Sequence, residues 1–138
     1  MTSDSRPFGL AWTALSLALA AHVVDEALTG FLDVYNPAVE SIRQRVSWFP
    51  MPVLTFDVWL GGLAVVVAVL LALSPLAYRG ARSLRIAAYP FAAVMLLNGI
   101  AHLAASVYLG RWAPGATTAP LLIAASVWIV VAERRTNR

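Results

Sequence analysis

The sequence predicts an all-α integral membrane protein: a four-helix bundle with a short amphipathic helix at the membrane interface between helices 1 and 2. The first observation is composition, because 60% of the 138 residues are hydrophobic and only 12% are charged. A soluble domain of this size has about twice that share of charged residues. The second is that the apolar residues form four long stretches, each near or above the roughly 20 residues that cross a bilayer core. No alternation typical of a membrane β-barrel occurs within them. We therefore expect one transmembrane domain over residues 1–138.

The four predicted spans cover about residues 8–31, 52–73, 84–109 and 117–132. The fourth is the shortest. The second contains Gly61 and Gly62. Small residues let helix backbones approach closely in membranes, so this pair indicates close helix packing.

The linker between the first two spans, residues 33–51, is the only long polar stretch. Asn36 is a plausible N-cap and Pro37 suits the first helical position, while Val39, Ile42 and Val46 recur at helical spacing. We interpret the segment as a short amphipathic helix at the outer surface, serving as a strut or as a gate over a site below it. The Trp-Phe-Pro-Met-Pro sequence at 48–52 should end it, since proline cannot continue the helical hydrogen bonds.

The basic residues indicate the orientation. All ten are arginine, and with four spans seven of them fall on the side of the two termini. These seven are Arg6, Arg79, Arg82, Arg85, Arg134, Arg135 and Arg138, against Arg43, Arg45 and Arg111 on the other side. Positive residues favour the cytoplasmic side, so we expect an inner-membrane protein with both termini in the cytoplasm. This placement explains the net charge of +3 without a nucleic-acid partner, and the lack of cysteine excludes thiolate metal sites.

Ionisable residues lie deep within the apolar stretches. His22, Asp25 and Glu26 are spaced i, i+3 and i+4 on the first predicted helix, so all three share one face. Asn98 and His102 share a face of the third. Ionisable groups are expensive inside a membrane and commonly mark functional sites.

The rise of an α-helix predicts that these groups lie at one depth. From the cytoplasmic edge, His22 is about 21 Å and Glu26 about 27 Å into the membrane, and Asn98 and His102 are about 18 and 24 Å in. Asp57, which enters from the other side, reaches about 23 Å of a core about 30 Å thick. We therefore expect all six to converge on the outer third of the bilayer.

Three interpretations of this cluster stay open. In the first, His22, Glu26, His102 and Asp57 bind a divalent metal such as zinc, iron or manganese, because imidazole and carboxylate suit these ions. In the second, no metal is bound and a carboxylic acid works beside a histidine as an acid and base pair. In the third, the cluster fixes helix register or relays protons.

A turn precedes the last span. Pro114 and Gly115 are typical turn residues, and Thr117 or Thr118 is a plausible N-cap of the final helix. The turn either serves only to connect two helices, or it places the N-terminus of the final helix where it binds an anionic headgroup.

Several of these residues resemble a known family. His22-Val-Val-Asp25-Glu26, Asn98-x-x-x-His102 and the Ala-Pro-Gly-Ala-Thr-Thr turn at 113–118 are similar to the bacterial HXXEE-domain membrane proteins, over nearly the whole chain. Asp25 departs from the Glu of the family motif, which shortens the reach of its carboxylate and makes Glu26 the better ligand. The resemblance implies a small polytopic membrane protein, and the family has no settled activity.

We expect an enzyme that acts on a lipid or isoprenoid-like, lipid-soluble molecule by hydrolysis, isomerisation or cyclisation. The reactive or metal-binding core is His22, Glu26 and His102, with Asp25 and Asp57 as further ligands or proton carriers and Asn98 orienting the substrate. The alternative is a small proton- or ion-coupled transporter or ion-binding membrane subunit. A third class is a structural partner in a complex. The sequence leaves undecided whether the protein forms a homo-oligomer.

Overall fold

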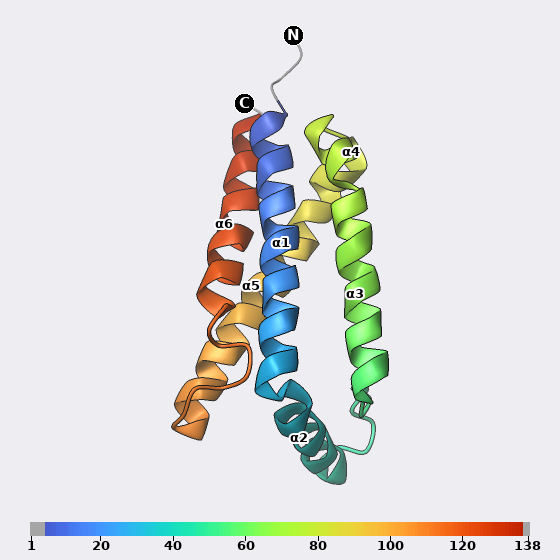
Figure 1. Ribbon diagram of the computed structural model, residues 1–138, viewed down its shortest axis with the longest axis vertical. Helices are drawn as coiled ribbons and strands as arrows, with labels where there is room; N and C mark the ends of the chain where they lie inside the picture. The colour runs from blue at the N-terminus through green and yellow to red at the C-terminus, as the bar shows by residue number, and fades with distance from the viewer. Residues whose placement is uncertain (1–4, 137–138) are drawn as a thin grey trace.

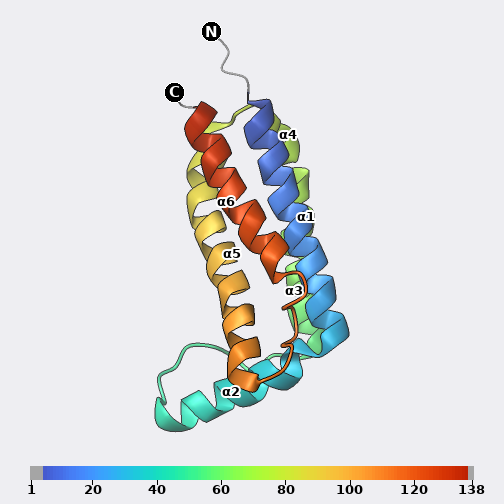
Figure 2. The same ribbon diagram turned by 90° about the vertical axis from the view of Figure 1, so that its left-hand side faces the viewer.

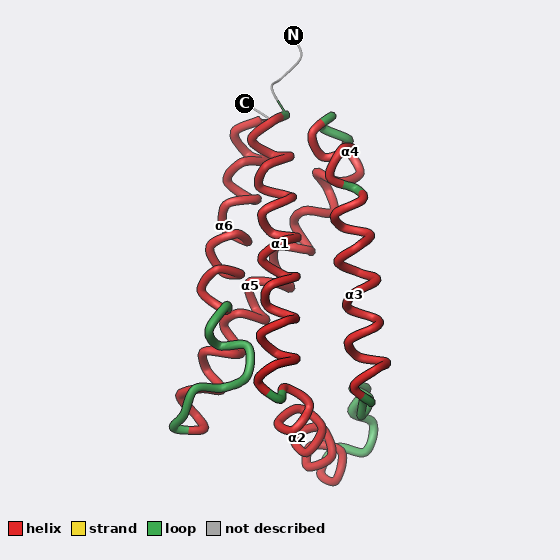
Figure 3. Tube along the Cα trace, in the orientation of Figure 1, coloured by secondary structure: helices red, strands yellow, loops and turns green. Residues whose placement is uncertain are grey.

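The computed structural model describes residues 5–136, which form six α-helices (Figure 1). The helices are α1 (Arg6–Thr29), α2 (Phe31–Arg45), α3 (Phe56–Ala72), α4 (Ser74–Tyr78), α5 (Arg82–Leu109) and α6 (Ala119–Thr136). No strand occurs in residues 5–136, and loops only connect helix ends (Figure 3). The all-α prediction is confirmed. Arg138, one of the arginines used for orientation, lies outside the described residues.

Helix α1 is the centre of the packing. It contacts α6, α3 and α4, whereas α5 packs mainly on α6. The start of α1 and the end of α6 lie together at one end of the molecule, and α2 lies at the opposite end (Figures 1 and 2). Helix α6 contacts both α1 and α5, whereas α1 and α5 make few contacts with each other.

The apolar core lies along the first half of α1. Phe8, Trp12 and Leu15 of α1 are buried there, together with Leu122 and Ile129 of α6. The three α1 residues recur at helical spacing, so they form one stripe on one face of α1. This packing holds α1 against α6 and leaves the second half of α1 to carry the polar residues.

Three helical segments are long and apolar enough to cross a membrane: Arg6–Thr29, Phe56–Tyr78 and Arg82–Leu109. Their outer faces are apolar as well, since Val65 of α3 is 64% exposed and Val94 of α5 is 58% exposed. Helices that are apolar all round belong in lipid or in the core of a larger protein. The chain is a membrane protein. Helix α6 has 18 residues, carries Glu133, Arg134 and Arg135 close to its last residue, Thr136, and is not among these three segments.

The prediction of close packing at Gly61 and Gly62 is wrong. A Cβ atom at either position would meet nothing within 4 Å. Close helix approach occurs instead at Gly9, where a Cβ would lie 2.5 Å from Tyr78 of α4, and at Gly99, where it would lie 2.7 Å from a side chain of α6. A glycine pair indicates that close packing is possible, but the rotation of its helix decides whether a neighbour is there.

The predicted start of the linker helix is also wrong. Helix α2 begins at Phe31, directly after Gly30, and Pro37 lies inside it. Gly30 adopts φ +77° and its N–H closes α1, so its left-handed conformation lets a second helix begin without a linker. Asn36 caps no helix: its amide donates to the Leu54 carbonyl at 2.9 Å and accepts from the Leu54 N–H at 3.0 Å. These two bonds tie α2 to the segment that leads into α3.

Candidate functional site

Two histidines and one glutamate meet between α1, α5 and α6. The Nε2 atom of His102 lies 3.0 Å from Glu26 Oε1, and the Nε2 atom of His22 lies 3.7 Å from the same oxygen. The two imidazole rings stand edge to face, with centroids 4.6 Å apart and planes at 82°. All three residues are buried. The structure thus brings together three of the residues predicted to form the site.

The helix geometry explains this meeting. His22 and Glu26 are four residues apart on α1, so their side chains lie on one face, one turn apart. His102 comes from α5, close to the level expected from the rise per residue. Helices α1 and α5 make few other contacts, so this cluster is one of the main links between them.

The hydrogen bond of His102 to the loop determines which of its two ring nitrogens carries a proton. That atom lies 2.5 Å from the carbonyl oxygen of Pro114, in the loop between α5 and α6. A carbonyl only accepts hydrogen bonds, so Nδ1 carries the proton and donates. In a neutral ring the Nε2 atom then presents a lone pair to Glu26.

His22 is held in the same way by Thr118. Its Nδ1 atom lies 2.9 Å from the Thr118 hydroxyl oxygen, and that hydroxyl donates to Asp25 Oδ2 at 3.0 Å. A hydroxyl has one proton, which goes to the carboxylate because bonds to charged acceptors are stronger. The hydroxyl oxygen therefore accepts from His22 Nδ1, and the Nε2 atom of a neutral His22 also presents a lone pair.

Three acceptor atoms therefore face one another in a buried site: two Nε2 atoms and one carboxylate oxygen. His22 Nε2 has no hydrogen-bond partner among the described residues and is inaccessible to solvent. Buried polar atoms almost always have a partner, so one that lacks it needs an explanation such as an ion. A proton or a metal cation between these atoms would satisfy all three acceptors.

The donor set fits a divalent metal. The ligand atoms of His22, Glu26 and His102 all lie within 4.8 Å of one another. Zinc binds nitrogen and oxygen at about 2.0 to 2.2 Å, so ligands on one ion lie at most about 4 Å apart. The two distances to Glu26, 3.0 and 3.7 Å, meet that limit, so Glu26 is close enough to share one ion with either imidazole, and all three ligand atoms lie within 4.8 Å. Metal-binding histidines also typically donate their other N–H to a carbonyl or to a carboxylate network, as both rings do here.

Asp25 contacts the site indirectly, through Thr118. Its Oδ2 atom accepts from the Thr118 backbone N–H and from the Thr118 hydroxyl, both at 3.0 Å. The carboxylate thus receives one of the free N–H groups at the start of α6, which a negative charge stabilises. Thr118 was predicted as a possible cap, but its hydroxyl bonds to Asp25 and His22, and the capping acceptor comes from α1. Asp25 is a positioning residue for His22.

The loop before α6 packs directly against the site. Residues 113–116 are buried, although they are not helical. Gly115 has φ +77°, and a Cβ atom there would lie 2.8 Å from His102 Nδ1 and 3.0 Å from Glu26 Cγ. Only glycine fits both this backbone conformation and this space. The turn predicted from Pro114 and Gly115 therefore forms one wall of the site.

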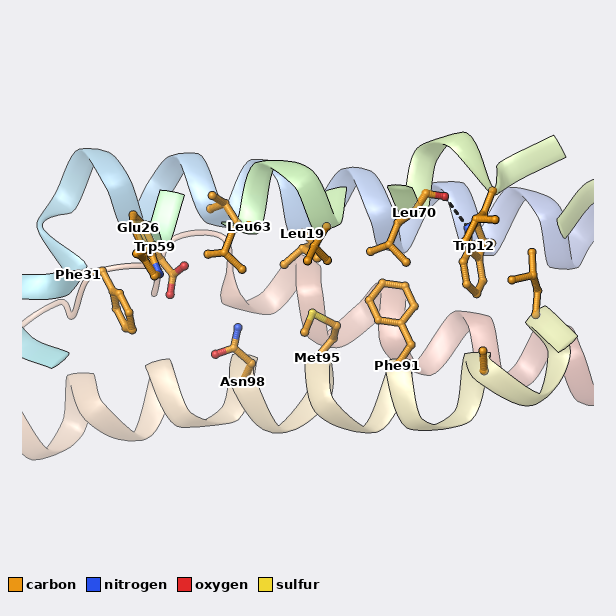
Figure 4. A pocket seen from close by; sticks show the side chains of 15 residues that line it. Trp12, Leu19, Glu26, Phe31, Trp59, Leu63, Leu70, Phe91, Met95 and Asn98 are labelled. Carbon is orange, nitrogen blue, oxygen red and sulfur yellow. Dashed lines mark hydrogen bonds between the residues drawn. The ribbon is translucent and has the colours of Figure 1, made fainter. Parts of the chain in front are cut away.

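Two predicted site residues lie elsewhere. Asp57 is exposed in the first turn of α3 and lies outside the group formed by His22, Glu26 and His102, so the structure does not bring it together with the other three predicted ligands. A carboxylate in the first turn of a helix is stabilised by the helix dipole, which explains its position. Asn98 is half-buried on α5 and points into a cleft that Glu26 lines from the opposite side (Figure 4).

This cleft runs between α1, α3 and α5. Its volume is about 480 Å³, and it extends from Glu26 and Asn98 at one end to Trp12 at the other (Figure 4). A second cavity of about 360 Å³ adjoins it beneath α2, with Asp33 and Asn36 in its wall, and Glu26 lines both. A third, of about 520 Å³, reaches His102 from the side. The site therefore stands at the junction of an apolar and a polar cavity.

Three groups that contact the site were not predicted from the sequence. The Pro114 carbonyl is a backbone group, which no residue type reveals. Thr29 accepts from the Gly115 N–H at 3.3 Å and so fastens the loop to α1, and Phe31 packs its ring 5.7 Å from that of His102. A usable signal was the run of small residues at 113–118, because only small residues let a loop enter a helix bundle.

Comparison with known proteins gives one match. A family model described as a protein of unknown function with HXXEE motif matches residues 12–129. No curated protein and no solved structure matches the chain. The matched segment contains the site from His22 to Thr118, with Asp25 at the fourth position of the His-x-x-Asp-Glu sequence. Because the match covers most of its length, the chain belongs to the HXXEE family.

Proposed function

We propose that this protein is a membrane-embedded enzyme that acts on a lipid or isoprenoid-like molecule through His22, Glu26 and His102. The observation that carries the proposal is the buried Nε2 atom of His22, which lacks a hydrogen-bond partner and faces a carboxylate at the end of an apolar cleft. A cluster that served only helix register would satisfy its own polar atoms. A reactive centre leaves an atom available for an ion, a proton or a substrate.

We further propose that His22 Nε2, His102 Nε2 and Glu26 Oε1 hold a divalent metal such as zinc, iron or manganese. A bound ion would act as a Lewis acid and make water a nucleophile near neutral pH. Thr118 and Pro114 orient the two rings through Nδ1, and Asn98 offers an amide to the polar group of the substrate. If no metal is bound, Glu26 and His102, 3.0 Å apart, are placed to exchange a proton as an acid and base pair.

The membrane setting is also a proposal. Helix α6 would be the fourth span, since its 18 residues rise about 27 Å. Its C-terminal arginines lie at the end of the molecule where α1 begins (Figure 1). Both termini would then be cytoplasmic in the inner membrane, the site would lie toward the outer side, and α2 would lie at the outer interface.

The transporter alternative receives less support. An ion that crossed the membrane from Glu26 would need polar groups along its path. Toward Leu84 the cleft is lined by apolar side chains, apart from Asn98 and the indole groups of Trp12 and Trp59. The Trp12 N–H already donates to the Leu70 carbonyl at 2.9 Å. The lining suits a hydrocarbon chain better than an ion.

Metal content, measured by mass spectrometry on detergent-purified protein, tests the metal proposal. We expect a near-stoichiometric metal in the wild type that is lost in His22→Ala and in His102→Ala. Asp57→Asn is the control, because Asp57 is exposed and lies outside the group. Metal retained in both histidine variants would refute this site, and a metal-free wild type would leave only the acid and base pair.

Enzymatic activity needs its own test. Membrane lipid extracts would be incubated with wild-type protein or with Glu26→Gln and compared by mass spectrometry. A product formed only by the wild type supports an enzyme. Identical lipid composition after both incubations would contradict it.

A further inference from the structure

The cleft between α1, α3 and α5 has the shape of a single chain. Its volume of about 480 Å³ lies in the range of small-molecule sites. The rise along α1 from Trp12 to Glu26 is about 21 Å, so the cleft is long for its volume. Two hydrocarbon chains side by side would need a shorter and wider space.

The lining of the cleft gives it a direction. Leu63 and Leu70 of α3 face Phe91 and Met95 of α5 across its length (Figure 4). The carboxylate and the amide of Glu26 and Asn98 both lie at one end. A bound amphiphile would therefore place its chain toward Trp12 and its polar head at the His and Glu site.

The neighbouring cavity indicates the charge of that head. Glu26, Phe31 and Trp59 line both the cleft and the polar cavity beneath α2. The remaining polar side chains of that cavity are Asp33 and Asn36, and none of the arginines within residues 5–136 lines it. Even with the proposed divalent ion on Glu26, the carboxylates of Glu26 and Asp33 balance its charge, so the cavity has no net positive charge to attract an anionic head such as a phosphate or diphosphate.

We propose that the substrate is an amphiphile with one long hydrocarbon chain and an uncharged, oxygen-bearing head, such as an alcohol or an ester. The chain occupies the cleft between α1, α3 and α5, and the head lies between Glu26, Asn98 and the polar cavity. This inference rests on the proposed function for its membrane setting and names the substrate class of the same site.

The test uses hexadecanol that carries a photoreactive diazirine at the far end of its chain, added to the full-length protein in detergent or vesicles. Labelled residues are mapped by mass spectrometry. We expect labelling near Trp12 and Leu84, at the apolar end of the cleft. Unlabelled hexadecanol should compete, while a two-chain phosphatidic acid and a prenyl diphosphate should compete poorly.

Two tryptophan variants of α3 separate the cleft from ordinary lipid contact. Leu70→Trp places a larger side chain in the cleft, so the hydrocarbon chain of the probe no longer fits without overpacking. Labelling near Trp12 should therefore fall about tenfold. The shorter dodecanol should become the better competitor. Val69→Trp is the matched control, because Val69 is 51% exposed and does not line the cleft, and labelling should stay at the wild-type level.

Labelling spread over exposed residues such as Val65 and Val94, and unchanged in Leu70→Trp, would overturn the inference. So would stronger competition by the diphosphate or the phosphatidic acid, or cross-links between cleft residues of two copies. Metal content measured on the same samples keeps the two proposals apart. Metal without cleft labelling refutes the substrate class alone, and cleft labelling without metal or lipid turnover refutes the enzyme alone.

Discussion

His102 Nε2 lies 3.0 Å from Glu26 Oε1, and this contact joins α5 to α1, two helices that make few contacts with each other. The carboxylate and the imidazole are both buried, so His102 Nε2 and Glu26 Oε1 each have little access to water as an alternative partner. Removal of one partner from a buried ionic pair costs about 3 to 5 kcal/mol, because the other charge stays behind. The pair therefore contributes both to chemistry and to the relative position of the helices, and experiments must separate the two roles.

Glu26→Gln separates them. Glutamine has the shape of glutamate, and its amide can donate to an imidazole Nε2, so we expect the melting temperature to stay close to the wild-type value. Metal should be absent from the purified variant and lipid turnover should be lost, because the amide lacks the negative charge. Glu26→Leu, which offers no hydrogen bond, should melt at a lower temperature. Equal destabilisation by both substitutions would instead assign Glu26 a purely structural role.

Gly115→Ala should disrupt the site through the loop. The added Cβ would lie 2.8 Å from His102 Nδ1 and would occupy a left-handed backbone conformation that costs about 1 to 2 kcal/mol. Gly110→Ala is the matched control, because Gly110 has φ +62° but nothing within 4 Å. We expect both variants to lose stability in thermal unfolding, and only Gly115→Ala to lose metal. Normal metal content in Gly115→Ala would show that the loop does not fix His102.

Substitution by alanine at two glycines inside helices should change the stability in opposite directions. At Gly99 of α5 an added Cβ would lie 3.0 Å from the Ala119 carbonyl oxygen of α6, a backbone atom that cannot rotate away. Gly99→Ala should therefore push α5 from α6 and lower the melting temperature. Gly61→Ala meets open space on α3 and should be neutral or stabilising by up to about 1 kcal/mol. A destabilised Gly61→Ala protein in detergent would reveal a partner helix at that surface.

Local spacing and helix rise were enough to predict that His22, Glu26 and His102 meet. The i, i+4 spacing fixes His22 and Glu26 on one face of α1, and a rise of about 1.5 Å per residue brings His102 to their level. The same calculation failed for Asp57. Depth is only one coordinate, and the rotation of α3 and the residue at which it begins decide where its first-turn side chains point.

Interactions that depend on backbone groups could not be predicted from the sequence. Asn36 followed by Pro37 is a typical helix start. In the structure, however, α2 begins at Phe31, directly after Gly30, and Asn36 bonds to Leu54 instead of capping a helix. The Pro114 carbonyl orients His102 through the conformation of a buried loop, which no side chain encodes. Such errors are expected where tertiary contacts override a local preference.

Thr118→Val tests whether the hydrogen bonds behind His22 tune the site. Valine keeps the shape of threonine and removes the hydroxyl that accepts from His22 Nδ1 and donates to Asp25. Loss of such a supporting partner typically lowers metal affinity about 10- to 100-fold, which competition with a chelator would measure. Thr118→Ser restores the hydroxyl and should restore the affinity. Thr117→Val is the control, since the Thr117 hydroxyl accepts only from the Trp112 indole, away from the site. Equal affinities in Thr118→Val and Thr117→Val would mean that Asp25 and Thr118 serve the start of α6 alone.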